Sequence, residues 1–371
     1  MCERRSASPM TPGVLEHKNS AVRLTLLLPS LTNLPPQNDS TDRPYTTHLP
    51  THFSFLFAAY PGLPRAKLEM RALADLTAIE TTFPSLPSSS SSSSATILAM
   101  AAWFSTLCRV DDLVETLHPD AVPHALLDSI SILRDGYISF HESVDVCLDD
   151  VIAAADVDTL NRVRKISYAL RNHLMSLLPR ATYQRVVDGV ADTWAGIVAE
   201  TYLRGQRKVD GDSYLEVRTR TCGLAPFFTL LAACNDTTTA DTLDGCCAGK
   251  SRAMVEEMEG CVRVAVGVQN DLVGLEKDIR TKESMNYVLV SAAAVATTTV
   301  GKDDVKSVDD VKVGIERAVE VHDKAVEMAT SLLAEIEREG GEAEAGCARE
   351  LVAFVGRHIK WAVGSRRYKT G

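Results

Sequence analysis

The sequence predicts an all-α fold. Apolar residues recur at three- and four-residue spacing over most of the chain after residue 95, which is the pattern of helices that bury one face. Few stretches alternate as a half-buried strand does, and no internal repeat with a period of about 20 to 50 residues is present. With 371 residues, 45% of them hydrophobic, the chain can bury the core of one large helical domain.

The first part of the chain differs in composition. Residues 1 to about 50 are rich in Pro, Ser, Thr and Asn without sustained periodicity, so we expect this segment to be disordered. Ala66 to Phe83 has helical spacing of apolar residues between two prolines, which predicts a helix. The uninterrupted serine run from Ser88 to Ser94 predicts a flexible loop over 85–95. The helical domain should therefore cover 51–371.

The helical pattern is nearly continuous after the serine run. Val288 to Val300 contains many β-branched residues, but its four alanines favour a helix over a strand. The other helices are expected at 95–117, 122–148, 158–177, 181–208, 211–220, 224–234, 248–277, 305–337 and 343–362.

Charge and cysteine content exclude several classes of protein. The net charge is −10 and the basic residues are dispersed, so no nucleic-acid-binding surface is expected. Ala21 to Leu31 and Val288 to Val300 are too short for a membrane span, and the first lacks a cleavage site for a signal peptide. The nine cysteines include no CxxC pair and no zinc-binding spacing. We therefore expect a cytoplasmic protein with reduced cysteines, either a monomer or a homodimer.

An acidic group follows one of the apolar helical stretches. Trp103 to Val110 leads directly into Asp111 and Asp112, and Glu115 lies one turn further on. In a helix, Asp111 and Glu115 share a face. Three carboxylates at the end of a core-facing helix repel one another unless a cation lies among them. The group is either part of a metal site or, as most acidic pairs are, a solvated helix end.

A second polar stripe lies far along the chain. Asn270, Gly274 and Asp278 are spaced by four residues, with Lys277 beside them. Amide and carboxylate oxygens are ligands that Mg²⁺ accepts, and Lys277 can contact a phosphate as a point charge. Gly274 is either a helix glycine that costs about 1 kcal/mol or a position where water replaces a ligand side chain. Oxygen ligands on two facing helices are suited to Mg²⁺ bound to a phosphate.

With both motifs in this order in a mostly helical chain, the sequence resembles a class I terpene synthase of the single-domain microbial, especially fungal, type over about 95–371. Asp111-Asp112-x-x-Glu115 resembles the aspartate-rich motif of the family, and Asn270-x-x-x-Gly274-x-x-x-Asp278 resembles its second magnesium motif. The second motif departs from the usual pattern at Gly274, where Ser or Thr is usual, and at Asp278, where Glu is commoner.

Two further segments carry the resemblance. Tyr214 to Gly223 resembles the segment whose arginine senses the diphosphate, which maps to Arg218. Trp361 to Tyr368 resembles the segment with the C-terminal Arg-Tyr pair, here Arg367 and Tyr368. The resemblance implies three Mg²⁺ ions held by Asp111, Asp112, Glu115, Asn270, Asp278 and a water at Gly274. It also implies a diphosphate site formed by Arg218, Lys277, Arg367 and Tyr368, with Asp111, Arg218 and Tyr368 as catalytic residues.

The resemblance implies a helical bundle around a central apolar cavity. In that cavity a linear isoprenyl diphosphate, expected to be farnesyl diphosphate, would ionise and cyclise to a sesquiterpene. Phe104 lies seven residues before Asp111 on the same helical face, and Trp361 precedes the Arg-Tyr pair. An aromatic face stabilises a nearby cation by about 0.5–2 kcal/mol, although ordinary core packing explains either side chain equally well.

Two other functions remain open, and a third is disfavoured by the second motif. The first is a diterpene synthase that acts on geranylgeranyl diphosphate. The second is a non-catalytic helical relative that binds prenyl chains. The third, a chain-elongating prenyltransferase, would carry a second aspartate-rich motif, whereas this chain has Asn270 and Gly274 in the second motif.

Overall fold

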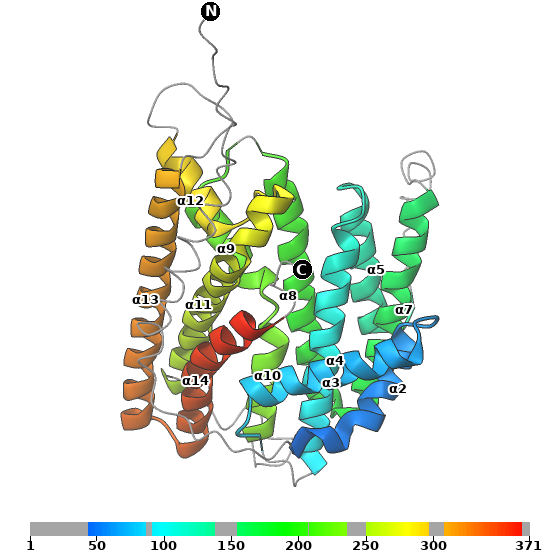
Figure 1. Cartoon of the computed structure of the whole chain (residues 1–371). Helices are drawn as coiled ribbons and strands as arrows, with labels where there is room; N and C mark the ends of the chain where they lie inside the picture. The colour runs from blue at the N-terminus through cyan, green and yellow to red at the C-terminus, as the bar shows by residue number, and fades with distance from the viewer. Residues whose placement is uncertain are drawn as a thin grey trace, which may run out of the picture.

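The computed structural model describes residues 44–86, 91–137, 154–206, 208–235, 250–296 and 308–365. These residues form helices and contain no strand, which confirms the predicted fold class. In chain order the elements are η1 (Pro44–His48), α2 (Leu49–Ala59), α3 (Arg65–Thr82), α4 (Ser91–Val114), α5 (Ala121–Asp135), α7 (Ala154–Leu177), α8 (Arg180–Arg204), α9 (Gly211–Thr221), α10 (Ala225–Asn235), α11 (Lys250–Thr281), α12 (Tyr287–Ala296), α13 (Val308–Glu339) and α14 (Glu342–Gly364) (Figure 1).

Most helix bounds lie within a few residues of the predicted ones. The largest difference is at α5, which ends at Asp135, whereas the periodicity predicts a helix to residue 148. Gly136 follows with φ +81, a left-handed conformation that glycine adopts without steric cost and that commonly ends a helix. Residues 138–153 lie outside the described part of the chain.

The prediction that residues 1–50 are disordered is wrong for residues 44–50. Tyr45 is fully buried, and its hydroxyl donates to the carbonyl oxygen of Phe83 over 2.7 Å. Helix α2 then begins at Leu49 with Pro50 in its first turn, where the missing N–H of proline costs nothing. Composition suggested disorder because the segment is rich in Pro and Thr, but the burial of Tyr45 and of the α2 side chains outweighs it.

The serine run is also more ordered than predicted. Helix α4 begins at Ser91, inside the segment expected to be a loop. Ser93 and Thr96 are buried, and the hydroxyl of Ser93 lies 3.6 Å from the sulfur of Cys234 on α10. Serine is only a moderate helix former, so packing against α10 decides the conformation here. Residues 87–90 lie outside the described part of the chain.

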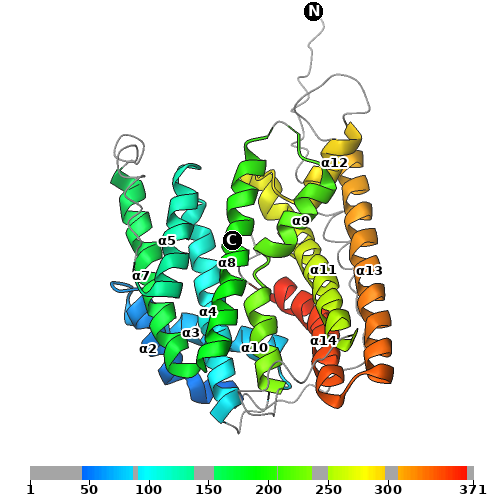
Figure 2. The same cartoon turned by 180° about the vertical axis from the view of Figure 1, so that it is seen from behind.

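The helices form a bundle whose long members run roughly side by side (Figures 1 and 2). Helix α11 packs against α13, α14 and α9, while α8 packs against α9, α10 and α5, and α4 packs against α7, α10 and α3. Helix α13 covers one flank of the bundle, and α5 and α7 form the other (Figure 1). Helices α3, α4, α8, α9, α10, α11 and α14 all contribute side chains to one central cavity.

A close contact fixes the break between α9 and α10 against α4. Gly223 lies in this break with φ +69, and its carbonyl oxygen accepts a hydrogen bond from the indole of Trp103 over 2.9 Å. A Cβ atom at Gly223 would lie 2.4 Å from the Cδ2 atom of Leu107, in a left-handed conformation that larger residues rarely adopt, so glycine is favoured here. The break positions the end of α9, which carries Arg218, beside α4.

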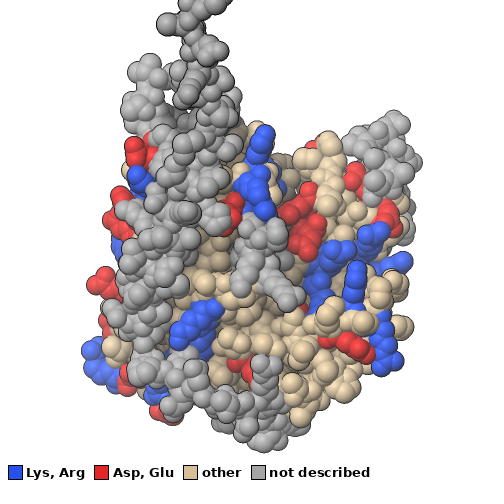
Figure 3. All heavy atoms as spheres, viewed as in Figure 1, with Lys and Arg blue, Asp and Glu red and all other residues tan. Residues whose placement is uncertain are grey.

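The basic residues, which are dispersed along the sequence, are also spread over the surface. On the face seen in Figure 3, Lys and Arg side chains form several separate groups, and the larger group at the right has Asp or Glu side chains next to it. None of the described helices has both the length and the apolar character that crossing a membrane requires. Among the described residues, the cysteines Cys108, Cys222, Cys234, Cys261 and Cys347 form no disulfide bond.

Candidate active site

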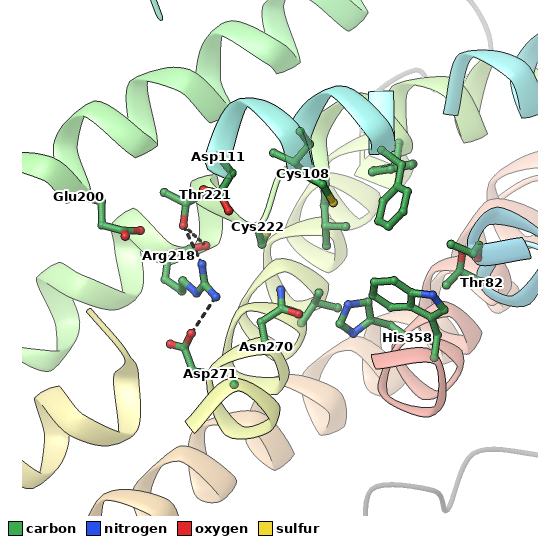
Figure 4. Close-up of a pocket in the computed structure, with 18 of the residues that line it drawn as sticks. Thr82, Cys108, Asp111, Glu200, Arg218, Thr221, Cys222, Asn270, Asp271 and His358 are labelled. Carbon is green, nitrogen blue, oxygen red and sulfur yellow. Dashed lines mark hydrogen bonds and ion pairs between the residues drawn. The ribbon is translucent and has the colours of Figure 1, made fainter. Parts of the chain in front are cut away.

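The central cavity is polar at one end and aromatic at the other. In Figure 4 the charged side chains of Glu200, Arg218 and Asp271 lie on one side of the cavity. The side chains of Thr82 and His358 lie on the opposite side. The polar and charged lining residues include Asp111, Glu115, Glu200, Arg204, Arg218, Asn270, Asp271, Lys277, Asp278 and Glu283. The apolar lining includes Ile79, Phe83, Phe104, Leu107, Leu224, Phe227, Val266, Met285, Phe354 and Trp361.

The two predicted motifs face the same cavity. Asp111 and Glu115 line it from α4 and the residue just beyond its end, and the amide of Glu115 donates to the carbonyl oxygen of Asp111 over 3.1 Å, as in a helical turn. Asn270 and Asp278 line it from α11, together with Lys277. Helical spacing therefore brings Asp111, Glu115, Asn270 and Asp278 to the same cavity.

Asp112 is the exception in the first motif. Its side chain is exposed, and Asp112 is not among the residues that line the cavity. Adjacent helical positions differ by about 100° in direction, and here Asp111 lines the cavity while the side chain of Asp112 is exposed. The structure does not place Asp112 with the other predicted metal ligands.

Gly274 lies between Asn270 and Asp278 on the cavity side of α11. A Cβ atom at this position would lie 3.3 Å from the Oδ2 atom of Asp278. The glycine therefore leaves a small space directly beside a carboxylate oxygen. This position fits the interpretation that a water occupies the site of a missing ligand side chain.

Desolvation and nearby negative charge raise the pKa values of two carboxyl groups at the polar end of the cavity. Desolvation, and then the carboxylate of Asp111, raise the pKa of Glu115. Desolvation also raises the pKa of Asp278, against a hydrogen bond of 2.8 Å that the amide of Asn286 donates to its Oδ2 atom. Each carboxylate would be stabilised in its charged form by a cation placed between the two helices.

Within the described ranges, no three His, Cys, Asp or Glu side chains lie close enough to enclose a metal ion by themselves. The donors of α4 and α11 face one another across the cavity instead. Their chemistry fits Mg²⁺, which takes few protein oxygens and completes its octahedron with water and phosphate oxygens.

Arg218 is held in place by a buried network. Its Nη2 atom lies 2.8 Å from the Oδ1 atom of Asp271, and its Nη1 donates to the hydroxyl of Thr221 over 3.2 Å (Figure 4). The backbone N–H of Tyr287 donates to Asp271 Oδ2 over 2.8 Å, and the hydroxyl of Tyr214 lies 3.1 Å from the same atom. The guanidinium thus faces the cavity in a fixed orientation and can receive an anion.

Several cavity residues were not predicted from the sequence. Glu200 on α8 forms an ion pair with Arg204 over 3.2 Å, and Arg204 also pairs with Glu283 over 3.2 Å. Burial raises the pKa of Glu200 to about 7, against the lowering effect of Arg218 and Arg204. In the sequence Glu200 and Arg204 are ordinary helix charges and Glu283 follows a predicted helix, so only the packing of the helices shows that all three line the cavity.

The aromatic end is a continuous set of rings. Phe104 and Trp361 meet edge to face with their centroids 5.5 Å apart, so both predicted aromatic residues line the cavity. Phe83 stacks with Phe354 at 4.8 Å and with Phe227 at 5.9 Å. Phe83 and Phe354 were missed because they are indistinguishable from core residues in the sequence. Arg367 and Tyr368 lie outside the described residues.

Helices that enclose an aromatic cavity with oxygen donors at one end define the isoprenoid synthase class of folds. A family model described as "Terpene synthase family 2, C-terminal metal binding" matches residues 103–299. The chain therefore belongs to this family and is a terpene synthase with a metal-binding domain. This result confirms the predicted resemblance, fold class and enzyme class, and the match includes both motifs and Arg218.

Solved structures share the fold at low sequence identity. Linalool/nerolidol synthase from Streptomyces clavuligerus, in complex with 2-fluorogeranyl diphosphate, is 18% identical with a TM-score of 0.58 over 89% of this chain and 97% of that one. 2-Methylisoborneol synthase from Streptomyces coelicolor A3(2), in complex with Mg²⁺ and geranyl-S-thiolodiphosphate, is 13% identical with a TM-score of 0.64 over 89% and 94%. Hedycaryol synthase in complex with nerolidol is 14% identical with a TM-score of 0.52 over 85% and 94%. No curated protein sequence matches the chain.

Proposed function

We propose that this terpene synthase uses Mg²⁺ to ionise farnesyl diphosphate and cyclises the resulting cation to a sesquiterpene, with release of diphosphate. The observation that carries the proposal is the division of the cavity, with oxygen donors and Arg218 at one end and aromatic rings at the other. A substrate with a charged diphosphate head and a long apolar tail is complementary to both ends at once.

Asp111 and Glu115 on one side, with Asn270 and Asp278 on the other, are the residues that would hold the metal. The fold relative from Streptomyces coelicolor, solved with Mg²⁺ and a thiolodiphosphate, supports this choice of ion. Bound Mg²⁺ supplies positive charge that stabilises the diphosphate as it leaves. Three ions, with a water at the Gly274 position, are part of the proposal.

Arg218 and Lys277 bind the diphosphate from the protein side. Arg218 is already oriented by Asp271 and Thr221, so little side-chain entropy is lost when its remaining N–H groups donate to phosphate oxygens. Arg367 and Tyr368 would add contacts from the segment after α14. Donors fixed around the leaving group lower the barrier to breaking the carbon–oxygen bond, because negative charge develops there in the transition state.

The aromatic end shapes and protects the cation. Phe104, Trp361, Phe83, Phe227 and Phe354 enclose the space with carbon atoms and ring faces. A ring face stabilises a nearby cation by about 0.5–2 kcal/mol without reacting with it. The same walls exclude water, which would otherwise capture the cation early.

The experiment that tests the substrate is a comparison of chain lengths. Purified protein is incubated with geranyl, farnesyl or geranylgeranyl diphosphate, each with Mg²⁺ or with EDTA, and pentane extracts are separated by gas chromatography–mass spectrometry. The proposal predicts a Mg²⁺-dependent cyclic product from farnesyl diphosphate as the preferred substrate. Preference for geranylgeranyl diphosphate would make the enzyme a diterpene synthase and overturn the proposed substrate.

A further inference from the structure

A line of hydrogen bonds leads from the surface of α13 to the aromatic end of the cavity. The Nδ1 atom of His322 lies 2.9 Å from Asp323 Oδ1, and its Nε2 atom lies 3.0 Å from the side-chain nitrogen of Gln269. The side-chain oxygen of Gln269 lies 2.8 Å from His358 Nδ1. Gln269 is 1% exposed and His322 is 1% exposed, so both inner members are shielded from water. Buried polar groups of this kind are fully paired in stable proteins.

The direction of every bond in the line is fixed by one backbone carbonyl. The Gln269 side-chain nitrogen also lies 3.2 Å from the carbonyl oxygen of Val355, which can only accept. The amide NH₂ therefore faces Val355 and His322, and the amide oxygen faces His358. An amide oxygen can only accept, so His358 must carry its proton on Nδ1. The Nε2 atom of His358 is then an unprotonated nitrogen with a free lone pair.

His358 presents this lone pair among aromatic rings. The residue lines the cavity with 6% of its surface exposed, and its ring centroid lies 5.7 Å from that of Phe354 and 5.6 Å from that of Trp361. The described residues provide no hydrogen-bond partner for Nε2. In Figure 4 the ring lies on the side of the cavity away from Glu200 and Asp271. Burial, and then the positive charge of Arg218, lower the pKa of His358 to about 3, so the imidazole is neutral at physiological pH.

We propose that His358 is the base that ends the reaction by taking a proton from the final carbocation, giving an olefin. This role rests on the proposed function, which supplies the cation. A C–H bond on the carbon next to the cationic centre breaks, its electron pair forms the new C=C bond, and the proton goes to His358 Nε2. Gln269 keeps the ring oriented through Nδ1 during the transfer, and is a positioning residue.

The low basicity of His358 suits this step. A carbocation gives up a neighbouring proton even to a weak base, so the position of Nε2 decides which hydrogen leaves. The imidazolium that forms is unstable in the apolar wall and beside Arg218, so it passes its proton to the diphosphate product or to water as the site opens. The neutral imidazole is thereby restored for the next turnover.

The variant that tests the proposal is His358→Phe, which keeps an aromatic ring and removes the lone pair. General-base catalysis contributes about 100-fold or more, so the rate of formation of the main olefin should fall by about that factor. Diphosphate release should fall much less, by under about tenfold, because ionisation precedes the step that His358 performs. The missing olefin should be replaced by isomeric olefins or by alcohols from water capture. His118→Phe changes an exposed histidine that does not line the cavity and should leave the product mixture unchanged.

An unchanged product mixture in a folded His358→Phe variant would overturn the proposal, as would a wild-type enzyme whose main product is an alcohol. Failure of the wild type to release diphosphate from any isoprenyl diphosphate would instead contradict the proposed function.

A measurement on the wild type alone keeps the inference testable if the variant does not fold. In protein labelled with ¹⁵N-histidine, the His358 ring should show a protonated Nδ1 and an unprotonated Nε2 by NMR, and a protonated Nε2 would contradict the proposed base.

Discussion

Arg218 of α9 and Asp271 of α11 form a buried ion pair across the cavity wall, with 2.8 Å between Nη2 and Oδ1. Asp271 directly follows Asn270, so the pair fixes Arg218, the proposed diphosphate-binding arginine, relative to the helix that carries the proposed second metal motif. The side chain of Asp271 is only 2% exposed and also accepts the backbone N–H of Tyr287 over 2.8 Å. The site is therefore organised before any substrate binds.

Asp271→Asn should destabilise the fold as well as the site. Removal of one partner of a buried ion pair leaves the other charge unpaired and costs about 3 kcal/mol or more. Urea unfolding followed by circular dichroism measures this loss. The matched control is Asp192→Asn, which breaks the Arg220–Asp192 pair of the same 2.8 Å length at a partly exposed site and should cost about 0–1 kcal/mol. Equal losses of unfolding free energy in the two variants would contradict the larger contribution expected of the Arg218–Asp271 pair.

Asp111 and Asp112 are adjacent in the sequence but lie in different surroundings, so their variants can be compared. Asp111 lines the cavity and Asp112 does not. Asp111→Asn should lower kcat/KM for farnesyl diphosphate by about 100-fold or more, because it removes a charged group that we propose holds the metal at the leaving group. Asp112→Asn should lower kcat/KM by less than about threefold. Comparable losses in both variants, with unchanged helicity, would argue that Asp112 reaches the metal in the working enzyme.

Gly274→Ser tests whether a water fills the glycine position. The new side chain would start 3.3 Å from Asp278 Oδ2 and place a hydroxyl among the proposed ligands. We expect the Mg²⁺ concentration needed for half-maximal activity to stay the same or to fall. Gly260→Ser is the control, because a Cβ on Gly260 of the same helix meets nothing within 4 Å. Complete loss of activity in a folded Gly274→Ser variant would count against a water at this position.

His173 should make the fold sensitive to acid. Its ring stacks on Phe55 of α2 with 5.0 Å between centroids, and burial, followed by His52, lowers its pKa to about 4. The unfolded chain therefore binds a proton between pH 6.5 and 4 that the folded chain does not. Stability from this group is present above pH 6.5 and is lost as the pH falls towards 4.

His173→Gln should accordingly lose less stability than the wild type between pH 7 and pH 5, by about 1–2 kcal/mol. The comparison is made from urea midpoints at the two pH values. His118→Gln changes an exposed histidine and should follow the wild-type profile. Parallel profiles for wild type and His173→Gln would contradict the assignment.

The helices and the two motifs could be predicted because both follow from local periodicity. Four-residue spacing puts Asn270 and Asp278 on one face of any helix, whatever packs against it. The exposure of Asp112 could not be predicted from the sequence, because a pair of adjacent aspartates does not show which of the two carboxylates lines a cavity. Arg218 was identified through the resemblance, and its position in the cavity agrees with that role.

The features that could not be predicted from the sequence depend on contacts between segments that are distant along the chain. Glu200, Asp271 and His358 resemble ordinary polar helix residues in the sequence, and their position in the cavity is set by how α8, α11 and α14 pack together. The same holds for Tyr45, whose burial against the end of α3 could not be read from a Pro- and Thr-rich segment.

The central claim is best tested by magnesium-dependent diphosphate release from farnesyl diphosphate. Released diphosphate is measured with a coupled phosphate assay for wild type and Asp111→Asn, with Mg²⁺ or with EDTA, and the extract is analysed by mass spectrometry in parallel. We predict release and a cyclic C15 product only for wild type with Mg²⁺. Release by the wild type that persists in EDTA, or no release with Mg²⁺ from a folded wild type, would contradict it.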